Sequence, residues 1–589
     1  MKVLLAAINA KYIHSNLAVY SLRANLLEYK NSVKLKEYTI NHQREDVIQD
    51  IYLEHPDVLV LSCYIWNIDF IQGILADIKK VLPQTDIWLG GPEVSYLSEQ
   101  FLKGNPQVKG IMRGEGEVTF RELVSFYVDK KIKLEDICGL TYVRQGAERK
   151  ICSNPDRKLS SMDDFAFAYE DLTDFENRII YYESSRGCPY SCAYCLSSVD
   201  KSVRFRSLEL VEKELLFFIE HKVPQVKFVD RTFNCSHKHA MGIFQIIKKH
   251  DNGITNFHFE ISADILNEEE LDFLSTLRPG LVQLEVGVQS VNEQTISAIH
   301  RKTTFEKLKK NVLFIKKRGN IHQHLDLIAG LPYEGYESFA HSFNAVYDMR
   351  PEQLQLGFLK VLKGAYIYDV HEKYGIVYSD KPPYEVLRTD WLSFDEIIRL
   401  KQVENMVEVY YNSMQFVRTM EFLLPFFDSA FSMYESIGIY YDEKGLFQVS
   451  HSRMARYEIL LGYVREKLVP EMEEAEREGV LECLKECLLY DLYLRENLKN
   501  RPQWAEGQEK YKEVIRQFYK KEAQEKSYLA DYEKTEEKQL YRMTHLEVFH
   551  YDVQDSFEKK LLPILFDYQH RSPLSHESRT YQVTELMNL

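Results

Sequence analysis

Three closely spaced cysteines constrain this chain more than any other feature. Cys188, Cys192 and Cys195 form a CxxxCxxC run directly after a strand-like segment at 178–182. A cubane iron–sulfur cluster needs four iron ligands, usually thiolates on a tight loop. Three thiolates leave one iron open to a ligand from outside the protein. An open coordination position likewise distinguishes catalytic zinc sites from structural zinc sites. The spacing therefore predicts a fold that shields a cluster with one open iron.

Three other interpretations of these cysteines stay open: a zinc knuckle, a disulfide pair with one spare thiol, and a ferredoxin-type cluster. Zinc would need a fourth Cys or His at short spacing, and the next ones after Cys195 are His221, Cys235 and His237. The chain has nine cysteines, and those outside the run form no evident disulfide framework. A cluster is the favoured interpretation.

The loop resembles that of the radical S-adenosylmethionine (SAM) superfamily, and Pro189 and Tyr194 also fit that loop. The resemblance implies a [4Fe-4S] cluster whose open iron binds the amino and carboxylate groups of SAM. An electron from a flavodoxin-type or ferredoxin-type donor would then cleave SAM to methionine and a 5′-deoxyadenosyl radical. In such enzymes the cofactor carries the chemistry, and the protein positions and shields it.

Size and charge limit the class of protein. A chain of 589 residues should hold about three or four domains. No apolar stretch reaches the ~20 residues of a membrane span, and the start at 1–5 is too short for a secretory signal. We therefore expect a cytoplasmic protein without a membrane span. The net charge of −15 argues against a dedicated nucleic-acid surface.

Residues 1–135 read as a doubly wound, Rossmann-like sheet. Apolar strands at 3–7, 58–62 and 86–91 alternate with amphipathic runs, which is typical of a parallel sheet covered on both faces. Such sheets bind ligands outside the carboxyl ends of their strands. The candidate ligand-binding residues there are His14, Ser62, Gly90 and Gly91. A structural histidine and a helix-capping serine are the alternatives for the first two.

A domain of this type directly before a CxxxCxxC domain resembles the cobalamin-binding half of cobalamin-dependent radical SAM enzymes. The Gly90-Gly91-Pro92 turn and the stretch 114–117 carry the likeness, which implies that His14, Ser62, Gly90 and Gly91 contact cobalamin. Residues 1–150 lack the DxHxxG motif that supplies a cobalt ligand in mutases, and radical SAM relatives often lack it too. The alternative is a domain kept for packing or dimerisation.

Residues 136–175 read as a linker and 176–365 as a partial (β/α)6 barrel. Six strand-like segments alternate with helical ones, fewer than the eight of a closed barrel. These segments are 178–182, 226–230, 257–261, 281–287, 324–330 and 354–358. Polar residues follow these strands, at the end of the barrel where active sites of such folds lie.

The resemblance also indicates which residues contact SAM. The second strand of radical SAM proteins often ends in an acid that holds the SAM amino group, and Asp230 takes that place here. The stretch 285–290 resembles the segment beside the ribose and the methionine carboxylate, and 330–332 resembles the segment near adenine. The predicted SAM contacts are Asp230, Glu285, Gln289, Ser290, Asp326 and Pro332. The acids among them could instead cap the following helices, and no residue is assigned a catalytic role.

Residues 366–589 read as a mainly α-helical domain. The charged run at 471–478 is typical of a solvated helix face, 545–553 alternates like a strand, and a polar tail begins at 570. The whole arrangement resembles a bacterial family whose C-terminal domain is uncharacterised. This domain could close over the barrel mouth, or it could serve packing or oligomerisation.

Two cofactors in one chain predict methyl transfer to an unactivated carbon: the radical abstracts hydrogen, and methylcobalamin supplies the methyl group. A cobalamin-linked radical cyclisation or rearrangement without methylation is the nearest alternative. A tRNA methylthiotransferase is disfavoured, because no small basic RNA-binding barrel follows the core. The non-enzymatic alternative is an iron–sulfur protein that binds a ligand or acts as a sensor without catalysing a reaction. Neither the substrate nor the oligomeric state can be inferred, because barrel-mouth loops set specificity independently of the fold.

Overall fold

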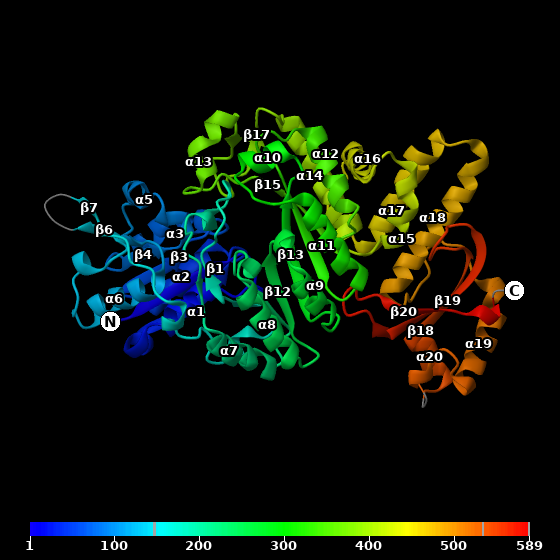
Figure 1. The fold of residues 1–589 in the computed structure, drawn as a ribbon, viewed down its shortest axis with the longest axis horizontal. Coiled ribbons are helices and arrows are strands. Elements are labelled where there is room, and N and C mark those ends of the chain that lie inside the picture. The colour runs from blue at the N-terminus through cyan, green and yellow to red at the C-terminus, as the bar shows by residue number, and fades with distance from the viewer. Residues whose placement is uncertain (145–148, 533–534, 587–589) are drawn as a thin grey trace. The chain divides into compact units, whose positions relative to one another are not determined.

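The computed structural model describes residues 1–144, 149–532 and 535–586. Contacts along the chain divide it into two compact units. The first unit comprises Met1–Ile321, Ile328–Gly335 and Gly357–Ser393, and the second comprises His322–Leu327, Tyr336–Leu356 and Phe394–Leu589. Figure 1 labels the helices and strands of both units.

The first unit begins with a mixed sheet in the order β2-β1-β3-β4-β5-β6-β7. Strands β1 to β5 pair in parallel, and β6 and β7 add antiparallel pairs at one edge. The strands are β1 Val3–Asn9, β2 Val33–Thr39, β3 Val58–Ser62, β4 Asp86–Gly90, β5 Gly110–Met112, β6 Leu140–Arg144 and β7 Lys150–Ser153. The predicted doubly wound sheet is confirmed, and β6 and β7 extend it past residue 135.

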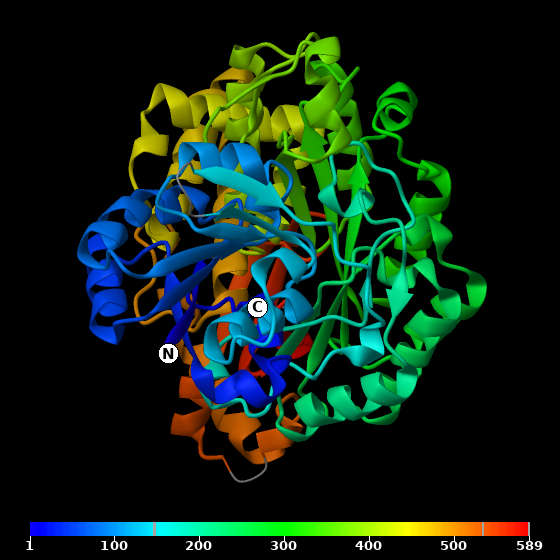
Figure 2. The ribbon, with the colours of Figure 1, turned by 90° about the vertical axis from the view of Figure 1, so that its left-hand side faces the viewer.

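Helices cover this sheet in pairs. Helix α1 (Leu17–Ala24) contacts α6 (Gly116–Val128), and α2 (Arg44–Glu54) contacts α3 (Ile68–Val81). Short helices α4 (Pro92–Ser95) and α5 (Ser98–Gly104) follow β4. Figure 2 shows the sheet between its helices, in blue and cyan. Because both faces are covered, every residue of β1 and β3 is buried, which explains their uninterrupted apolar sequences.

The second sheet supplies the barrel. In the first unit, parallel strands follow the order β13-β12-β11-β8, with helices in the connections. The strands are β8 Ile180–Tyr182, β11 Gln225–Phe228, β12 Asn256–Ile261 and β13 Val282–Gln289. The helices are α7 Leu208–Glu220, α8 His237–Lys249, α9 Glu268–Ser275, α10 Glu293–Ala298 and α11 Phe305–Arg318. β14 (His322–Ala329), α12 (Tyr336–Tyr347) and β15 (Gln353–Phe358) complete the series, so strands form at all six predicted places.

A segment after β15 packs with the N-terminal parts of the chain. It contains helix α13 (Tyr366–Val370) and the antiparallel strands β16 (Val377–Tyr378) and β17 (Val386–Arg388). The buried Tyr384 hydroxyl donates a hydrogen bond to Glu93, in the helix that follows β4. Lys363 Nζ lies 3.9 Å from the same carboxylate. This segment therefore braces a loop at the carboxyl end of the N-terminal sheet.

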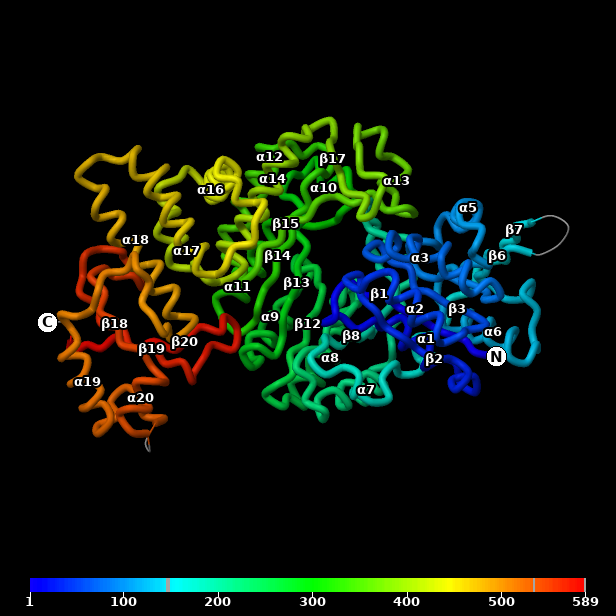
Figure 3. Tube along the Cα trace, turned by 180° about the vertical axis from the view of Figure 1, so that it is seen from behind, coloured from blue at the N-terminus to red at the C-terminus, as the bar shows by residue number. Residues whose placement is uncertain are grey.

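The second unit is rich in helices, as predicted, and ends in an antiparallel sheet. Its helices from residue 394 on are α14 Phe394–Val407, α15 Val417–Leu423, α16 Ala430–Glu443, α17 Arg453–Tyr463, α18 Glu474–Arg495, α19 Lys512–Glu525 and α20 Glu537–Met543. The sheet consists of β18 Thr544–Tyr551, β19 Lys559–Arg571 and β20 Ser578–Gln582. Helix α18 packs against this sheet, as Figure 3 shows from behind.

Two sequence predictions fall on this sheet. The predicted strand at 545–553 is confirmed as β18. The predicted polar tail from 570 is wrong, because β19 reaches Arg571 and β20 pairs with it from Ser578. Cross-strand pairing offsets the polar character of these residues. No helix in the described part of the chain is long and apolar enough to span a membrane.

Removal of core volume tests the packing of the N-terminal sheet. Ile74 of α3 is fully buried, whereas Val81 at the end of the same helix is 46% exposed. We expect Ile74→Ala to cost about 2–5 kcal/mol, because it leaves a cavity, and Val81→Ala to cost under about 0.5 kcal/mol. Hydrogen exchange of the β3 and β4 amides measures both. Equal effects would contradict the packing described.

Candidate cofactor site

A large cavity opens at the carboxyl ends of the N-terminal strands. Its volume is about 1240 Å³, above the roughly 300–1,000 Å³ of common small-molecule sites. The loops after β1, β3, β4 and β5 line it together with residues of β8, β11 and β12 and of the cysteine loop. The N-terminal sheet and the barrel strands β8, β11 and β12 of the first unit therefore border the same cavity.

Glycines keep one wall of this cavity free of side chains. Gly91 has a φ of +107°, and an added Cβ would collide with the carbonyl oxygen of Cys63. Gly114 has a φ of +70° and also lines the cavity. Only glycine adopts these conformations without strain. A bare backbone next to a cavity of this size fits a bulky ligand such as cobalamin.

All four predicted cobalamin contacts line the cavity: His14, Ser62, Gly90 and Gly91. The His14 ring forms a 2.7 Å hydrogen bond through Nδ1 with the Tyr181 hydroxyl of β8. Arg178 Nη2 donates a 2.9 Å hydrogen bond to the His14 carbonyl. Burial and then Lys11 lower the pKa of His14. The imidazole is thus held against the barrel, and its role toward cobalamin stays a prediction.

The three thiols of the cysteine run lie close to one another. Cys188 and Cys192 are buried and Cys195 is partly exposed, and all are free thiols. Burial raises the pKa of Cys192, Arg301 lowers it, and Cys195 and Cys188 raise it further. Such mutual influence requires neighbouring sulfur atoms. The thiol set fits the predicted cluster.

Backbone contacts hold the cysteine loop in place. The Cys188 amide donates to the Asp200 carbonyl at 3.0 Å, and the Ala193 amide donates to the Ile299 carbonyl at 2.9 Å. Gly187 has a φ of +91°, and an added Cβ would lie 2.5 Å from the Ser202 carbonyl oxygen. The glycine before the first cysteine is therefore required by a close approach of backbone.

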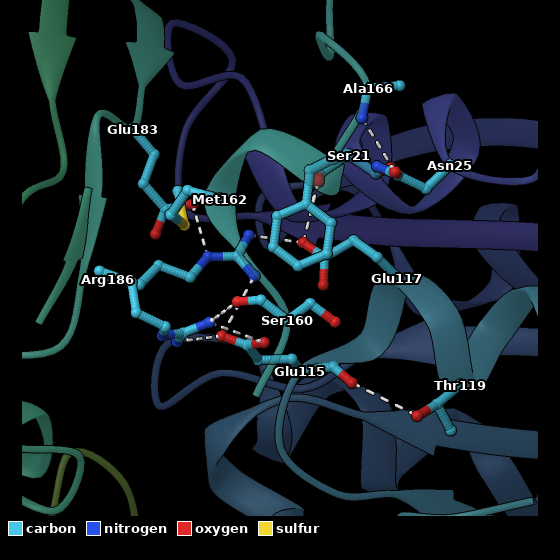
Figure 4. A network of polar contacts seen from close by, with 12 residues as sticks. Ser21, Asn25, Glu115, Glu117, Thr119, Ser160, Met162, Ala166, Glu183 and Arg186 are labelled. Atoms are coloured by element: carbon cyan, nitrogen blue, oxygen red, sulfur yellow. Dashed lines mark hydrogen bonds and ion pairs between the residues drawn. The ribbon is translucent and has the colours of Figure 1, made fainter. Parts of the chain in front are cut away.

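An ion-pair network joins this loop to the N-terminal domain (Figure 4). Arg186 Nη2 lies 2.5 Å from Glu117 and Nε lies 2.8 Å from Glu183. Glu115 lies 3.5 Å from Arg186 and 2.5 Å from Arg204. Burial by itself would raise the pKa of Glu117, but Arg186 holds it below its ordinary value. The network fixes the cysteine loop to the loop that follows β5.

Charged side chains line the barrel interior next to the cavity. Lys227 Nζ lies 2.9 Å from Glu285, and His258 Nε2 lies 3.0 Å from the same carboxylate. Lys227, Tyr181 and Glu260 line the cavity. Glu285, a predicted SAM contact, therefore lies close to two side-chain nitrogens, one from the adjacent strand β12 and one from β11.

Asp230 occupies a different position from the other predicted contacts. It is fully buried, and its carboxylate accepts hydrogen bonds from the Ser184 amide at 2.9 Å, the Ser184 hydroxyl at 2.6 Å and the Ser185 hydroxyl at 2.5 Å. Burial raises its pKa. These bonds tie the end of β11 to the segment before the cysteines, whereas the adjacent Arg231 lines the cavity.

The remaining predicted contacts fall into two groups. Ser290 donates a 2.6 Å hydrogen bond to Glu334, which stands two residues after the buried Pro332. The roles of Gln289, Ser290 and Pro332 toward SAM stay predictions. Gln289 is buried and has a φ of +71°. Asp326 belongs to the second unit, where it lies 3.0 Å from His324 Nε2.

Comparison with known proteins matches three domains. Residues 3–124 match the B12 binding domain, 182–346 the radical SAM superfamily, and 372–566 a protein family of unknown function, DUF4080. The chain therefore contains a B12 binding domain, a radical SAM domain and a DUF4080 domain, in that order. These domains imply a [4Fe-4S] cluster, SAM and cobalamin as the cofactors of this radical SAM protein.

Two curated relatives and one solved structure resemble this radical SAM protein. It is 26% identical to the cobalamin-dependent radical SAM methyltransferase TokK of Streptomyces tokunonensis, over 53% of this chain and 48% of that protein. It is 22% identical to the anaerobic magnesium-protoporphyrin IX monomethyl ester cyclase of Rubrivivax gelatinosus, over 55% of this chain and 60% of that protein. The chain spans about half the length of the first curated relatives it matches.

The structure of the cobalamin-dependent SAM radical enzyme OxsB with aqua-cobalamin bound superposes with a TM-score of 0.59. The match covers 83% of this chain and 80% of that chain at 16% identity. At this identity the likeness establishes a shared fold.

Sequence reasoning missed several residues of this radical SAM protein's site. Arg186, Glu183, Arg204 and Arg301 contact the cysteine loop or its partners, yet no motif marks their roles. For Arg186 a signal existed, since it stands two residues before Cys188. Arg301 lies over a hundred residues from Cys192, so only the fold brings them together.

Gly91→Ala tests the glycine wall. The strain and the collision with Cys63 should cost about 1–3 kcal/mol, and a cost of this size in the binding conformation lowers cobalamin affinity about 5- to 150-fold. Gly104→Ala is the matched control, because within the described ranges nothing lies within 4 Å of its added Cβ. Titration of the purified protein with hydroxocobalamin measures both. Unchanged affinity in Gly91→Ala would contradict this assignment of the wall.

Arg186→Met tests the ion-pair network. It leaves Glu117 and Glu183 without their shared cation, which should destabilise the cysteine loop by about 3–5 kcal/mol. Arg44→Met is the control, because Arg44 forms an exposed pair with Asp69 of a kind that contributes about 0–1 kcal/mol. Hydrogen exchange of the loop peptides measures the difference, and equal protection in both variants would refute the role of the network.

Proposed function

We propose that this protein is a cobalamin-dependent radical SAM methyltransferase that methylates an unactivated carbon. One observation carries the proposal: the predicted cobalamin loops and the segments flanking the cysteines line the same cavity. When bound, the cluster with SAM supplies a hydrogen-abstracting radical, and cobalamin supplies the methyl group. Reaction at carbon then requires both cofactors to face one substrate, which a shared cavity permits.

The chain's own residues would bind and orient these groups. Cys188, Cys192 and Cys195 would hold the cluster through three irons, and the wall with Gly91 and Gly114 would leave room for cobalamin. The Arg186 network keeps the two cofactor loops in a fixed relation. Burial of reacting groups in such a cavity excludes water and so protects a reactive radical from quenching.

A radical cyclisation without methylation is the second candidate. The observation that favours it is the likeness to the magnesium-protoporphyrin ester cyclase of Rubrivivax gelatinosus, over 55% of this chain. The two reactions share cofactors and differ in the fate of the substrate radical. Their products separate them, because methyl transfer also yields S-adenosylhomocysteine.

The proposal includes the cell compartment and the electron donor. A reduced, oxygen-sensitive cluster and nine free thiols suit the reducing cytoplasm. A flavodoxin-type or ferredoxin-type protein would supply the electron. The net charge of −15 argues against a dedicated nucleic-acid surface.

Anaerobic reconstitution tests the proposal. Protein reconstituted with iron, sulfide and hydroxocobalamin should hold about four irons and one cobalt per chain. With reductant and SAM it should release 5′-deoxyadenosine, methionine and S-adenosylhomocysteine. Iron without cobalt would refute cobalamin dependence, and 5′-deoxyadenosine without S-adenosylhomocysteine would favour the cyclase. A cluster that cleaves no SAM would indicate a binding or sensor protein.

Replacing a single cluster cysteine tests the metal site. Cys188→Ala, Cys192→Ala and Cys195→Ala should each lose most cluster iron and at least about 100-fold of SAM cleavage, because a cubane needs its thiolate ligands. Cys152→Ala, on β7 at the far edge of the N-terminal sheet, is the control and should retain both. Iron counts and 5′-deoxyadenosine yields measure these effects. Full cleavage in any of the three variants would overturn the assignment.

A further inference from the structure

Arg301 connects the cysteine loop to the end of β13. Its Nη1 lies 3.9 Å from Cys192 Sγ and 3.2 Å from the Tyr194 hydroxyl. Its Nη2 donates a 2.5 Å hydrogen bond to the Gly287 carbonyl, within the stretch predicted to flank SAM. The guanidinium therefore lies directly beside one sulfur of the predicted cluster.

Several other arginines of the first unit have a carboxylate partner. Arg178 pairs with Glu37, Arg204 with Glu115 and Arg206 with Glu214. Among the described residues no carboxylate lies within ion-pair distance of Arg301, and its Nε is buried without a hydrogen-bond partner. Its neighbouring anion, once the thiol is deprotonated for metal binding, is the Cys192 thiolate.

A fixed cation at this position changes the energy of the cluster's two oxidation states. One electron from the low-potential donor makes the cluster more negative by one charge, and its potential depends on nearby charge, hydrogen bonds to sulfur and solvent exposure. Arginine stays protonated at every physiological pH, and a charge-assisted bond to a thiolate strengthens as that sulfur gains electron density. The reduced state therefore gains more from the guanidinium than the oxidised state does.

We propose that Arg301 raises the reduction potential of the cluster by placing its positive charge beside the Cys192 sulfur. The proposal rests on the cluster of the proposed function but not on cobalamin or methyl transfer. An experiment can therefore refute the role of Arg301 without refuting cobalamin dependence or methyl transfer, and the reverse. Two other roles make different predictions: a contact for the SAM carboxylate would alter SAM binding alone, and a loop brace would alter only stability.

Three variants of the full chain separate these roles. Arg301→Gln removes the charge, Arg301→Lys keeps a charge but loses the planar pair of donors, and Lys302→Gln removes a charge from the exposed neighbouring residue. Each is reconstituted anaerobically, counted for iron, and titrated against solution potential while the reduced cluster is followed by electron paramagnetic resonance. SAM is added in a second series.

In Arg301→Gln we expect the ratio of reduced to oxidised cluster at a fixed potential to fall about tenfold, a shift of about 59 mV to more negative potential for one electron. Arg301→Lys should shift less in the same direction, and Lys302→Gln should match the wild type. A wild-type potential in Arg301→Gln with full iron would overturn the proposal, whether or not SAM binding weakens. If Arg301→Gln holds no cluster, the uncharged Arg301→Met takes its place, and a wild-type potential with full iron in that variant overturns the proposal.

Discussion

The contact between Arg186 and two carboxylates, those of the buried Glu117 and the half-buried Glu183, is the interaction on which the site depends. A guanidinium can bind several carboxylates at fixed angles, which a lysine ammonium cannot. Glu117 comes from the first turn of α6, which follows β5, and Glu183 comes from the segment that leads to Cys188. The buried charge of Glu117 depends on Arg186, so the N-terminal domain and the cysteine loop are energetically coupled.

This coupling explains why one cavity can serve two cofactors. The carboxyl ends of the N-terminal strands and the barrel strands β8, β11 and β12 open onto the same space of about 1240 Å³. Glycines at 90 and 91 remove side chains from one wall, while Lys227 and Glu260 line the barrel wall. A wall without side chains leaves room for a large ligand, and a charged wall suits polar groups of SAM or a substrate.

Much of the site could be predicted because its parts are local in sequence. The cysteine spacing and the Gly90-Gly91 turn each lie within a few residues, and all of them border the cavity or the predicted cluster. Asp230 shows the limit of such reasoning. An acid after the second strand resembles a ligand-binding residue, yet Ser184 and Ser185 from another strand end occupy its oxygens. Its partners are long-range, and no periodicity in the sequence reveals them.

The sequence by itself determined the order of domains, the parallel sheet of uninterrupted apolar strands, the partial barrel and the three thiols, since each follows from local pattern. Only the tertiary structure decided which charges meet. Arg186 finds Glu117, and Arg301 finds the sulfur of Cys192, across 69 and 109 residues. It also decided that the end of the chain forms strands β19 and β20 rather than a polar tail. Ion pairs and cross-strand pairs depend on three-dimensional proximity, which chain folding creates and local composition does not encode.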